Sequence, residues 1–196
     1  MANLADRISA GRLDARIEIV VSSRPGVPGI EKARDRGLAT AVLARKEFVS
    51  DEGAFDCEGY TRALLDILDP RRVELIALAG FMSRLGATIF DRYPIVNIHP
   101  ALLPLHGGAG MYGHHVHEAV LAAREPDSGC SVHFVDPEYD SGPIIAQRRV
   151  RVLAADTPDT LADRVQSAER DLYPEVIGWI AAGRVRIERG RVNVSP

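Results

Sequence analysis

The chain has 196 residues, 46% of them hydrophobic and 26% charged, so it is long enough to bury a full core and is typical of one soluble globular domain. Its formal net charge of −3, with both signs scattered along the chain, excludes the basic field of a nucleic-acid-binding protein. Two distant cysteines favour neither a disulfide framework nor a zinc ribbon, and no stretch predicts a signal peptide or a transmembrane helix, so we expect a cytoplasmic protein without nucleic-acid or membrane partners.

The first half of the chain alternates helical and strand patterns. In chain order these predict a helix over 3–10, a strand over 16–23, a helix over 30–37, a strand over 39–44, an amphipathic helix over 56–69 and a nearly continuous apolar strand over 73–80. Apolar runs of this kind suit a parallel sheet that is covered by helices on both faces. The predicted fold class is therefore α/β, with a doubly wound, mostly parallel sheet.

The second half continues the alternation and ends in a hairpin. The patterns predict a helix over 82–93, a strand over 95–98, a glycine-rich loop over 106–113, a helix over 114–125, strands over 128–136 and 143–152, a long helix over 157–183 and a hairpin over 184–194 that turns near Arg189 and Gly190. Thr157 is the expected N-cap of the long helix, with Pro158 at its first position. No linker or repeat interrupts the chain, which predicts one domain over residues 1–196.

Histidines and glycines of the second half raise two alternatives. All six histidines fall within residues 99–133, namely His99, His106, His114, His115, His117 and His133. A metal site lacks a carboxylate or cysteine at a recognisable ligand spacing, so a solvated helix start is the competing interpretation. Gly108, Gly110 and Gly113 match GxGxxG but do not leave a strand directly, which favours an active-site loop or an ordinary surface loop over a nucleotide site.

Asn97 and His99 form the third candidate site. Residues two apart in a strand point to the same side, here near the carboxyl end of a strand, where α/β sheets place their ligands. An asparagine amide can donate to a developing oxyanion, and a histidine can exchange a proton at neutral pH. The competing interpretation is a structural pair that bonds to nearby backbone. Pro100 and Pro104 stiffen the turn that follows and favour the functional reading.

Acidic residues follow the next predicted strand. Asp136, Glu138 and Asp140 precede a Ser-Gly-Pro turn, and Asp140 is the acid that the turn geometry is expected to hold. Together with Asn97 and His99 it would form an acyl-transfer site without a protein nucleophile, because the chain lacks a GxSxG elbow, a Walker loop and a cysteine near the histidines.

Four motifs in order give the chain a family resemblance. They are AGFMSRL at 79–85, NIHPALLP at 97–104, SVHFVDPEYDSGPII at 131–145 and RVQSAERDLYPEVI at 164–177. With them the chain resembles the phosphoribosylglycinamide formyltransferase (glycinamide ribonucleotide transformylase) family, the folate-dependent enzymes of purine synthesis, through almost its whole length. Formyl transferases that act on methionyl-tRNA share only the Asn-x-His, LLP and Asp elements.

This resemblance implies an activity and roles for individual residues. The activity is transfer of a formyl group from 10-formyltetrahydrofolate, without a metal, to the amine of glycinamide ribonucleotide. Asn97 would bind the formyl oxygen, His99 would assist proton transfer, and Asp140 would orient His99 and a water and help protonate the departing folate nitrogen. The residues implied in substrate binding are Met82, Ser83, Arg84 and Leu85 for the folate pocket, Asp136 in the loop that closes over the pterin, and Gln166 and Glu169 for the ribonucleotide.

The chain also departs from the family pattern. Met1 to Leu4 align with the end of a glycine-rich phosphate turn, so the first strand and most of that cradle are expected to be missing. A start site assigned too far downstream, a short form completed by a partner or a second copy, and a non-catalytic folate-binding homologue all remain open. So do a homodimer and a formyltransferase acting on another amino sugar or nucleotide. Ser83 beside Arg84 shifts the usual basic position of the folate segment by one residue.

Overall fold

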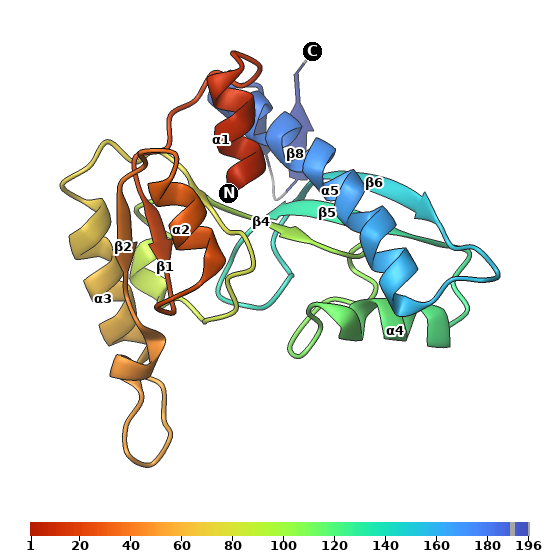
Figure 1. Ribbon diagram of the computed structural model, residues 1–196, viewed down its shortest axis with the longest axis horizontal. Helices are drawn as coiled ribbons and strands as arrows, with labels where there is room; N and C mark the ends of the chain where they lie inside the picture. Colours follow the sequence, from red (N-terminus) through yellow and green to blue (C-terminus); the bar gives the residue numbers. More distant parts are fainter. Residues whose placement is uncertain (189–190, 196) are drawn as a thin grey trace. The chain divides into compact units, whose positions relative to one another are not determined.

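The structure is a computed structural model that describes residues 1–188 and 191–195, and the chain packs as two compact units, Met1–Ile95 and Val96–Pro196. Each unit combines helices with strands (Figure 1). No helix in the described ranges is both long and apolar enough to cross a membrane.

The first unit holds a short parallel ladder with helices beside it. Its elements are α1 (Ala2–Ser9), β1 (Val20–Ser22), α2 (Pro28–Arg34), β2 (Thr40–Val42), the 3-10 turn η1 (Arg45–Phe48), α3 (Cys57–Leu68), β3 (Ile76–Ala77) and the 3-10 turn η2 (Ala87–Ile89). Strands β1 and β2 are parallel, with Val21 opposite Ala41, and α2 contacts both (Figure 1).

Helix α3 shows why the amphipathic pattern over 56–69 folds as predicted. The Asp56 side chain accepts a hydrogen bond of 2.8 Å from the Gly59 amide and so satisfies one of the free donors at the helix start. The apolar face of the helix is buried, and its Tyr60 ring lies against the rings of Phe48, Phe55 and Phe81. The buried stripe was predicted from the sequence, whereas the Asp56 cap was not.

The helix predicted over 82–93 is wrong. Only η2 is helical there, and the backbone amides that an α-helix would use are bound by α3 instead. The Gly86 amide donates to the Thr61 hydroxyl at 2.7 Å, and the Ala87 amide donates to the Glu58 carboxylate at 2.9 Å. Side chains of α3 thus satisfy these backbone donors. Helical hydrogen bonds would therefore bring this segment no further stabilisation.

Three strands of the first unit are shorter than predicted, since 16–23 contributes only β1, 39–44 only β2 and 73–80 only β3. The apolar runs correctly identify extended segments. A ladder, however, extends only as far as its partner does, and β2 offers three residues. Composition alone could not supply that length.

The second unit is an antiparallel ladder with two helices and a terminal hairpin. Its elements are β4 (Ile95–His99), which begins at the last residue of the first unit, α4 (His114–Ala122), β5 (Asp127–Phe134), β6 (Ile144–Arg151), α5 (Pro158–Ala181), β7 (Val185–Glu188) and β8 (Arg191–Val194). Helix α5 lies along β5 and β6 and contacts α4 (Figure 1). The described ladders are therefore mixed, parallel in β1–β2 and antiparallel in β4–β5–β6, and they confirm an α/β fold.

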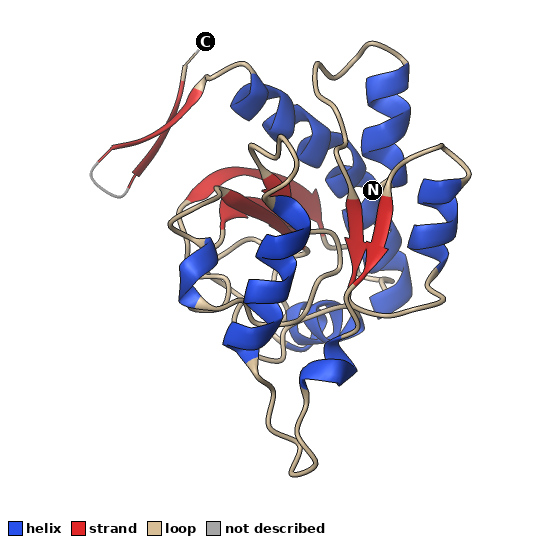
Figure 2. Cartoon of the chain, turned by 90° about the vertical axis from the view of Figure 1, so that its left-hand side faces the viewer, coloured by secondary structure: helices blue, strands red, loops and turns tan. Residues whose placement is uncertain are grey.

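The C-terminal hairpin and the cap of the long helix are also confirmed. Thr157 caps α5, exchanging hydrogen bonds with Thr160, and Pro158 occupies the first turn. Strands β7 and β8 pair antiparallel as a two-stranded ribbon after α5 (Figure 2). The turn predicted near Arg189 and Gly190 lies outside the described residues.

The core of the second unit forms between its sheet and helices. Side chains from β4, α4, β5 and α5 share this interior and are nearly or fully buried: Val96, Val116, Val120, Val132, Leu161, Val165 and Val176. The Tyr173 hydroxyl of α5 donates to the Val96 carbonyl at 3.1 Å, so α5 is tied to the strand that carries Asn97 and His99.

Candidate active site

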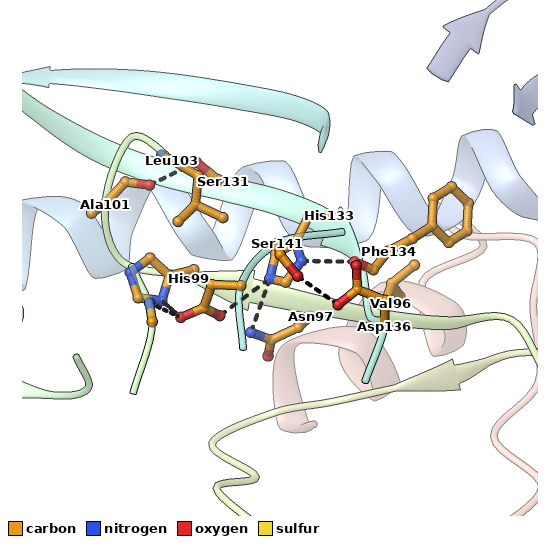
Figure 3. Close-up of polar contacts among 12 residues, drawn as sticks. Val96, Asn97, His99, Ala101, Leu103, Ser131, His133, Phe134, Asp136 and Ser141 are labelled. Carbon is orange, nitrogen blue, oxygen red and sulfur yellow. Dashed lines mark hydrogen bonds and ion pairs between the residues drawn. The ribbon is translucent and has the colours of Figure 1, made fainter. Parts of the chain in front are cut away.

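Strand β4 brings Asn97 and His99 to one face of the antiparallel ladder. Asn97 lies opposite His133 and His99 opposite Ser131, so polar side chains from two strands gather on this face (Figure 3). His99 is 3% exposed and His133 is 1% exposed. Buried imidazoles need hydrogen-bond partners, and the following contacts supply them.

His99 is held between a backbone carbonyl and a carboxylate. Its Nε2 lies 2.8 Å from the His106 carbonyl oxygen, which can only accept, so Nε2 carries a proton. Its Nδ1 then faces Asp140 Oδ2 at 3.5 Å. Protonation of Nδ1 turns this contact into an ion pair, which makes it a place where a proton can be held and released.

Asp140 is positioned by the loop that carries it and by the glycine-rich loop. Its backbone has φ 54°, a left-handed conformation that aspartate tolerates better than most residues. The Gly108 amide donates to Oδ2 at 2.9 Å. Gly142 lies two residues after Asp140, at the bend. A Cβ at this position would lie 2.0 Å from the Phe134 carbonyl oxygen, so only glycine fits there.

His133 connects Asn97 with Asp140. Its Nδ1 donates to the Phe134 carbonyl at 2.8 Å, which leaves Nε2 to accept from Asn97 Nδ2 at 3.3 Å. The same Nε2 lies 3.6 Å from Asp140 Oδ1. Burial lowers the pKa of His133, although the Phe134 carbonyl and Asp140 oppose the shift, and the neutral ring is the form that can accept from Asn97.

Ser131 holds the turn that follows His99. Its hydroxyl donates to the Ala101 carbonyl at 2.7 Å and accepts from the Leu103 amide at 3.0 Å (Figure 3). Gln147 of β6 donates to the same hydroxyl at 2.8 Å and to the Leu103 carbonyl at 2.9 Å. The turn with Pro100 and Pro104 is thus fastened to β5 and β6, and it fixes where His99 ends its strand.

The Asp136 side chain accepts its hydrogen bonds from residues of its own loop. Its Oδ1 accepts from the Ser141 hydroxyl at 2.7 Å and from the Glu138 amide at 3.1 Å, which closes the loop over 136–141 (Figure 3). The loop therefore carries one acid that shapes it, Asp136, and one that faces the two histidines, Asp140.

Gln166 and Glu169 lie one turn apart on α5, Gln166 exposed and Glu169 half-buried. Burial raises the pKa of Glu169 to about 7, with Arg170 opposing the shift. Burial also raises the pKa of the Cys130 thiol to about 12, and the Glu169 charge adds to that rise, which places Glu169 beside β5. Among the described residues, no hydrogen bond or ion pair joins Gln166 or Glu169 directly to Asp140.

The predicted folate segment belongs to the first unit and precedes η2. Met82 is 54% exposed, Arg84 is exposed, Ser83 is half-buried, and Leu85 packs into the core with 9% exposure. Three of the four side chains are thus accessible to a ligand, whereas Leu85 serves the packing of the unit.

The sequence pattern did not single out three contributors to the site. His133 appeared only as a member of the histidine group, and neither the Gly108 amide nor Gln147 was proposed. The clue for His133 was its place two residues after Ser131 in a strand with polar residues on one face. Its pairing with Asn97 depends on strand register, which the sequence does not state.

Three alternatives can be weighed against this geometry. Among residues 1–188 and 191–195, no three His, Cys, Asp or Glu side chains are grouped so that they could hold a metal ion. His114 and His115 are exposed beside Asp159 and Glu118, as in a solvated helix start. Gly108 lies at Asp140, which agrees with the interpretation of the glycine-rich segment as an active-site loop.

The arrangement can stabilise an oxyanion and move a proton. One Asn97 N–H is directed at His133, which leaves the second for a ligand oxygen. The His99–Asp140 pair is a proton donor and acceptor within the same group of residues. Cys130, a buried residue with a raised pKa, is a poor nucleophile.

Comparison with known proteins identifies relatives along most of the chain. The family model described as Formyl transferase matches residues 1–177. Phosphoribosylglycinamide formyltransferase of Escherichia coli (strain K12) is 35% identical over 186 residues, covering 94% of this chain and 82% of that protein. The chloroplastic phosphoribosylglycinamide formyltransferase of Arabidopsis thaliana is 38% identical over 180 residues, covering 91% of this chain and 60% of that protein. The crystal structure of glycinamide ribonucleotide transformylase 1 from Symbiobacterium toebii has a TM-score of 0.88 at 32% identity, covering 100% of this chain and 88% of that one.

Proposed function

The chain belongs to the formyl transferase family, and from that premise we propose that it transfers a formyl group from 10-formyltetrahydrofolate to the amine of glycinamide ribonucleotide. The observation that carries the proposal is the contact of 3.5 Å between His99 Nδ1 and Asp140 Oδ2, beside the Asn97 amide. Relatives that bear the phosphoribosylglycinamide formyltransferase name support the choice of substrates.

The proposed reaction needs an oxyanion donor and a proton carrier. The substrate amine attacks the formyl carbon, a C–N bond forms, and the formyl oxygen becomes negatively charged. Asn97 donates its second N–H to that oxygen, which typically lowers such a barrier by about 3 kcal/mol. The proton lost by the attacking amine passes to the His99–Asp140 pair and then to the folate nitrogen, whose bond to the formyl carbon breaks.

Asp140 is suited to face the reactants because it is the more accessible member of the pair. Its side chain is 12% exposed, against 4% for the His99 side chain, whose Nε2 is occupied by the His106 carbonyl. We propose that Asp140 exchanges the proton with the substrates or with a bound water, while His99 holds it at Nδ1 between the two transfers.

We propose roles in substrate binding for the remaining predicted residues. Met82, Ser83 and Arg84, with Leu85 behind them, would line the folate pocket, and the Asp136 loop would cover the pterin. Gln166 and Glu169 would hold the ribonucleotide, with the partly ionised Glu169 accepting from hydroxyl groups. A family match over residues 1–177 spans both units and supports one formyltransferase domain.

A cytoplasmic location completes the proposal. Cys57 and Cys130 are both free thiols, which suits a reducing compartment. The proposed partners are the two small molecules alone.

Formyl transfer by the purified chain is the decisive measurement. The absorbance change on release of tetrahydrofolate reports transfer, mass spectrometry of the formylated product identifies the acceptor, and calorimetry measures binding of each substrate separately. Transfer to glycinamide ribonucleotide supports the proposal. Binding of folate without transfer would instead favour a non-catalytic homologue, and transfer only to another amino sugar or nucleotide would reassign the acceptor.

A further inference from the structure

The Val96–Pro196 unit contains a cavity beside the turn that follows His99. It has a volume of about 240 Å³ and is formed by the Leu102–His106 segment, Val120 of α4, the turn that leads into β5, and two side chains of β6. None of the proposed catalytic or substrate-binding residues lines it. At about 30 Å³ for each water, the space corresponds to a molecule on the order of eight non-hydrogen atoms.

Two buried polar atoms in the cavity wall have no hydrogen-bond partner. The Ser128 hydroxyl belongs to a residue that is only 2% exposed, and the His106 Nε2 atom is likewise shielded. An unpaired buried polar group destabilises the fold, and native proteins avoid it. A rotation of either side chain would turn its unpaired hydroxyl or ring nitrogen toward an occupant of the cavity.

The charge of the wall indicates the sign of that occupant. Glu125 Oε1 lies 3.9 Å from His106 Nε2, and among the described residues no Lys or Arg forms an ion pair with Glu125. The second acid, Asp127, is already paired with Arg149 at 3.3 Å. One carboxylate without a strong cation thus borders the space, which favours a positively charged group.

Apart from Gln147, the rest of the wall is apolar. Leu102, Val120 and Pro126 line the cavity, and Leu105 is 55% exposed at its side. An apolar wall with a few convergent polar groups is the usual composition of a small-molecule site.

We propose that this cavity binds a small primary ammonium compound with a short apolar tail. The ammonium donates to the Glu125 carboxylate and to the Ser128 hydroxyl, and the tail packs against Leu102 and Val120. His106 connects this site to the active site, because its ring lines the cavity while its carbonyl accepts from His99 Nε2 at 2.8 Å. An occupant that displaces the His106 main chain also moves the acceptor that orients His99.

Isobutylammonium chloride is a suitable probe, with isobutanol and isovalerate as the neutral and anionic controls of similar shape. Each is titrated at constant ionic strength into the ¹⁵N-labelled chain while the amide signals of the non-proline residues in 102–106 and 125–128 are followed. We expect saturable shifts with the ammonium probe. Binding should be at least about tenfold weaker for the alcohol and absent for the carboxylate. Equal responses to the three probes, or no saturation in the millimolar range, would mean that the cavity holds water only.

Variants separate the site from its surroundings. Glu125→Gln keeps the shape but removes the charge, so the ammonium probe should bind at least about tenfold more weakly. Ser128→Ala removes the hydroxyl and should also weaken binding, and it replaces the first variant if that one fails to fold. Glu118→Gln is the matched control, because Glu118 is an exposed α4 acid beside His115 that does not line the cavity. Unchanged affinity in both Glu125→Gln and Ser128→Ala would overturn the proposed site.

The connection to His99 has its own readout. The ring nitrogen signals of His99 should shift as the probe saturates the wild-type chain and should not shift in Glu125→Gln. Saturable binding that leaves the His99 signals unchanged would retain the site and reject its effect on the active site. These signals do not depend on the formyl acceptor, so failure of the proposed transfer reaction leaves this test intact.

Discussion

Asn97 and His133 face each other across the β4–β5 ladder, and Asn97 Nδ2 lies 3.3 Å from His133 Nε2. The proton of the His133 ring is on Nδ1, where the Phe134 carbonyl accepts it, so Nε2 presents a lone pair. The asparagine must therefore direct its nitrogen and not its oxygen at the ring. This orientation gives the amide one spare N–H, and it is the feature that suits Asn97 to an oxyanion.

Replacing Asn97 with alanine should reduce kcat by about a hundredfold or more, because the donor to the oxyanion is lost. Steady-state kinetics with varied 10-formyltetrahydrofolate would show the loss mainly in kcat, with KM for the folate little changed. Asn193→Ala, in the β7–β8 hairpin, is the control and should retain normal turnover. A normal kcat for Asn97→Ala would remove this residue from the mechanism.

His99→Ala and Asp140→Asn should each lower turnover by at least about a hundredfold, since either change removes the proton carrier. Thermal unfolding followed by circular dichroism should show that both variants remain folded. Turnover close to that of the unaltered chain, in either variant, would contradict the assigned roles.

His133→Leu should lower kcat, because leucine cannot accept the hydrogen bond that orients the Asn97 amide. The variant tests whether the histidine acts through the asparagine. The informative measurement is a double-mutant cycle, in which His133→Leu is made both in the unaltered chain and in Asn97→Ala. In the unaltered chain we expect a loss of about tenfold or more in kcat, and in Asn97→Ala little further loss. Fully additive losses would assign His133 a role independent of Asn97.

Glu169→Gln should stabilise the chain above neutral pH but not in acid. Burial raises the pKa of Glu169 from 4.5 to about 7, so between these values the folded state holds more protons than the unfolded state. The free energy of unfolding therefore falls as pH rises through this window, by up to about 3 kcal/mol for this group. Urea unfolding of both proteins at pH 5 and pH 8 should show the variant gaining only at pH 8. The same difference at both pH values would reject the raised pKa.

Gly142→Ala should destabilise the second unit by more than about 2 kcal/mol, because the added Cβ would lie 2.0 Å from the Phe134 carbonyl oxygen. It should also reduce turnover, because Gly142 forms the bend next to Asp140. Chemical unfolding and kinetics measure the two effects. Gly29→Ala in α2 is the control, since its Cβ would meet no atom within 4 Å and should leave stability unchanged or slightly higher. Equal stability of the two variants would show that the bend tolerates a side chain.

The sequence by itself determined the features that depend on local chemistry. Thr157 caps its helix as predicted because a side-chain oxygen there can reach an amide three residues on. The α/β class, the terminal hairpin and the strand end with Asn97 and His99 also followed from alternation, apolar runs and motif spacing.

Tertiary structure decided what depends on partners distant in the chain. Helix 82–93 does not form because Thr61 and Glu58 of α3 take its backbone donors. His133 joins Asn97 only through the register of β4 with β5, and Asp140 turns toward His99 only where Gly108 and Gly142 permit. A local pattern specifies which groups a segment offers, whereas the contacts that satisfy them are chosen by packing between segments.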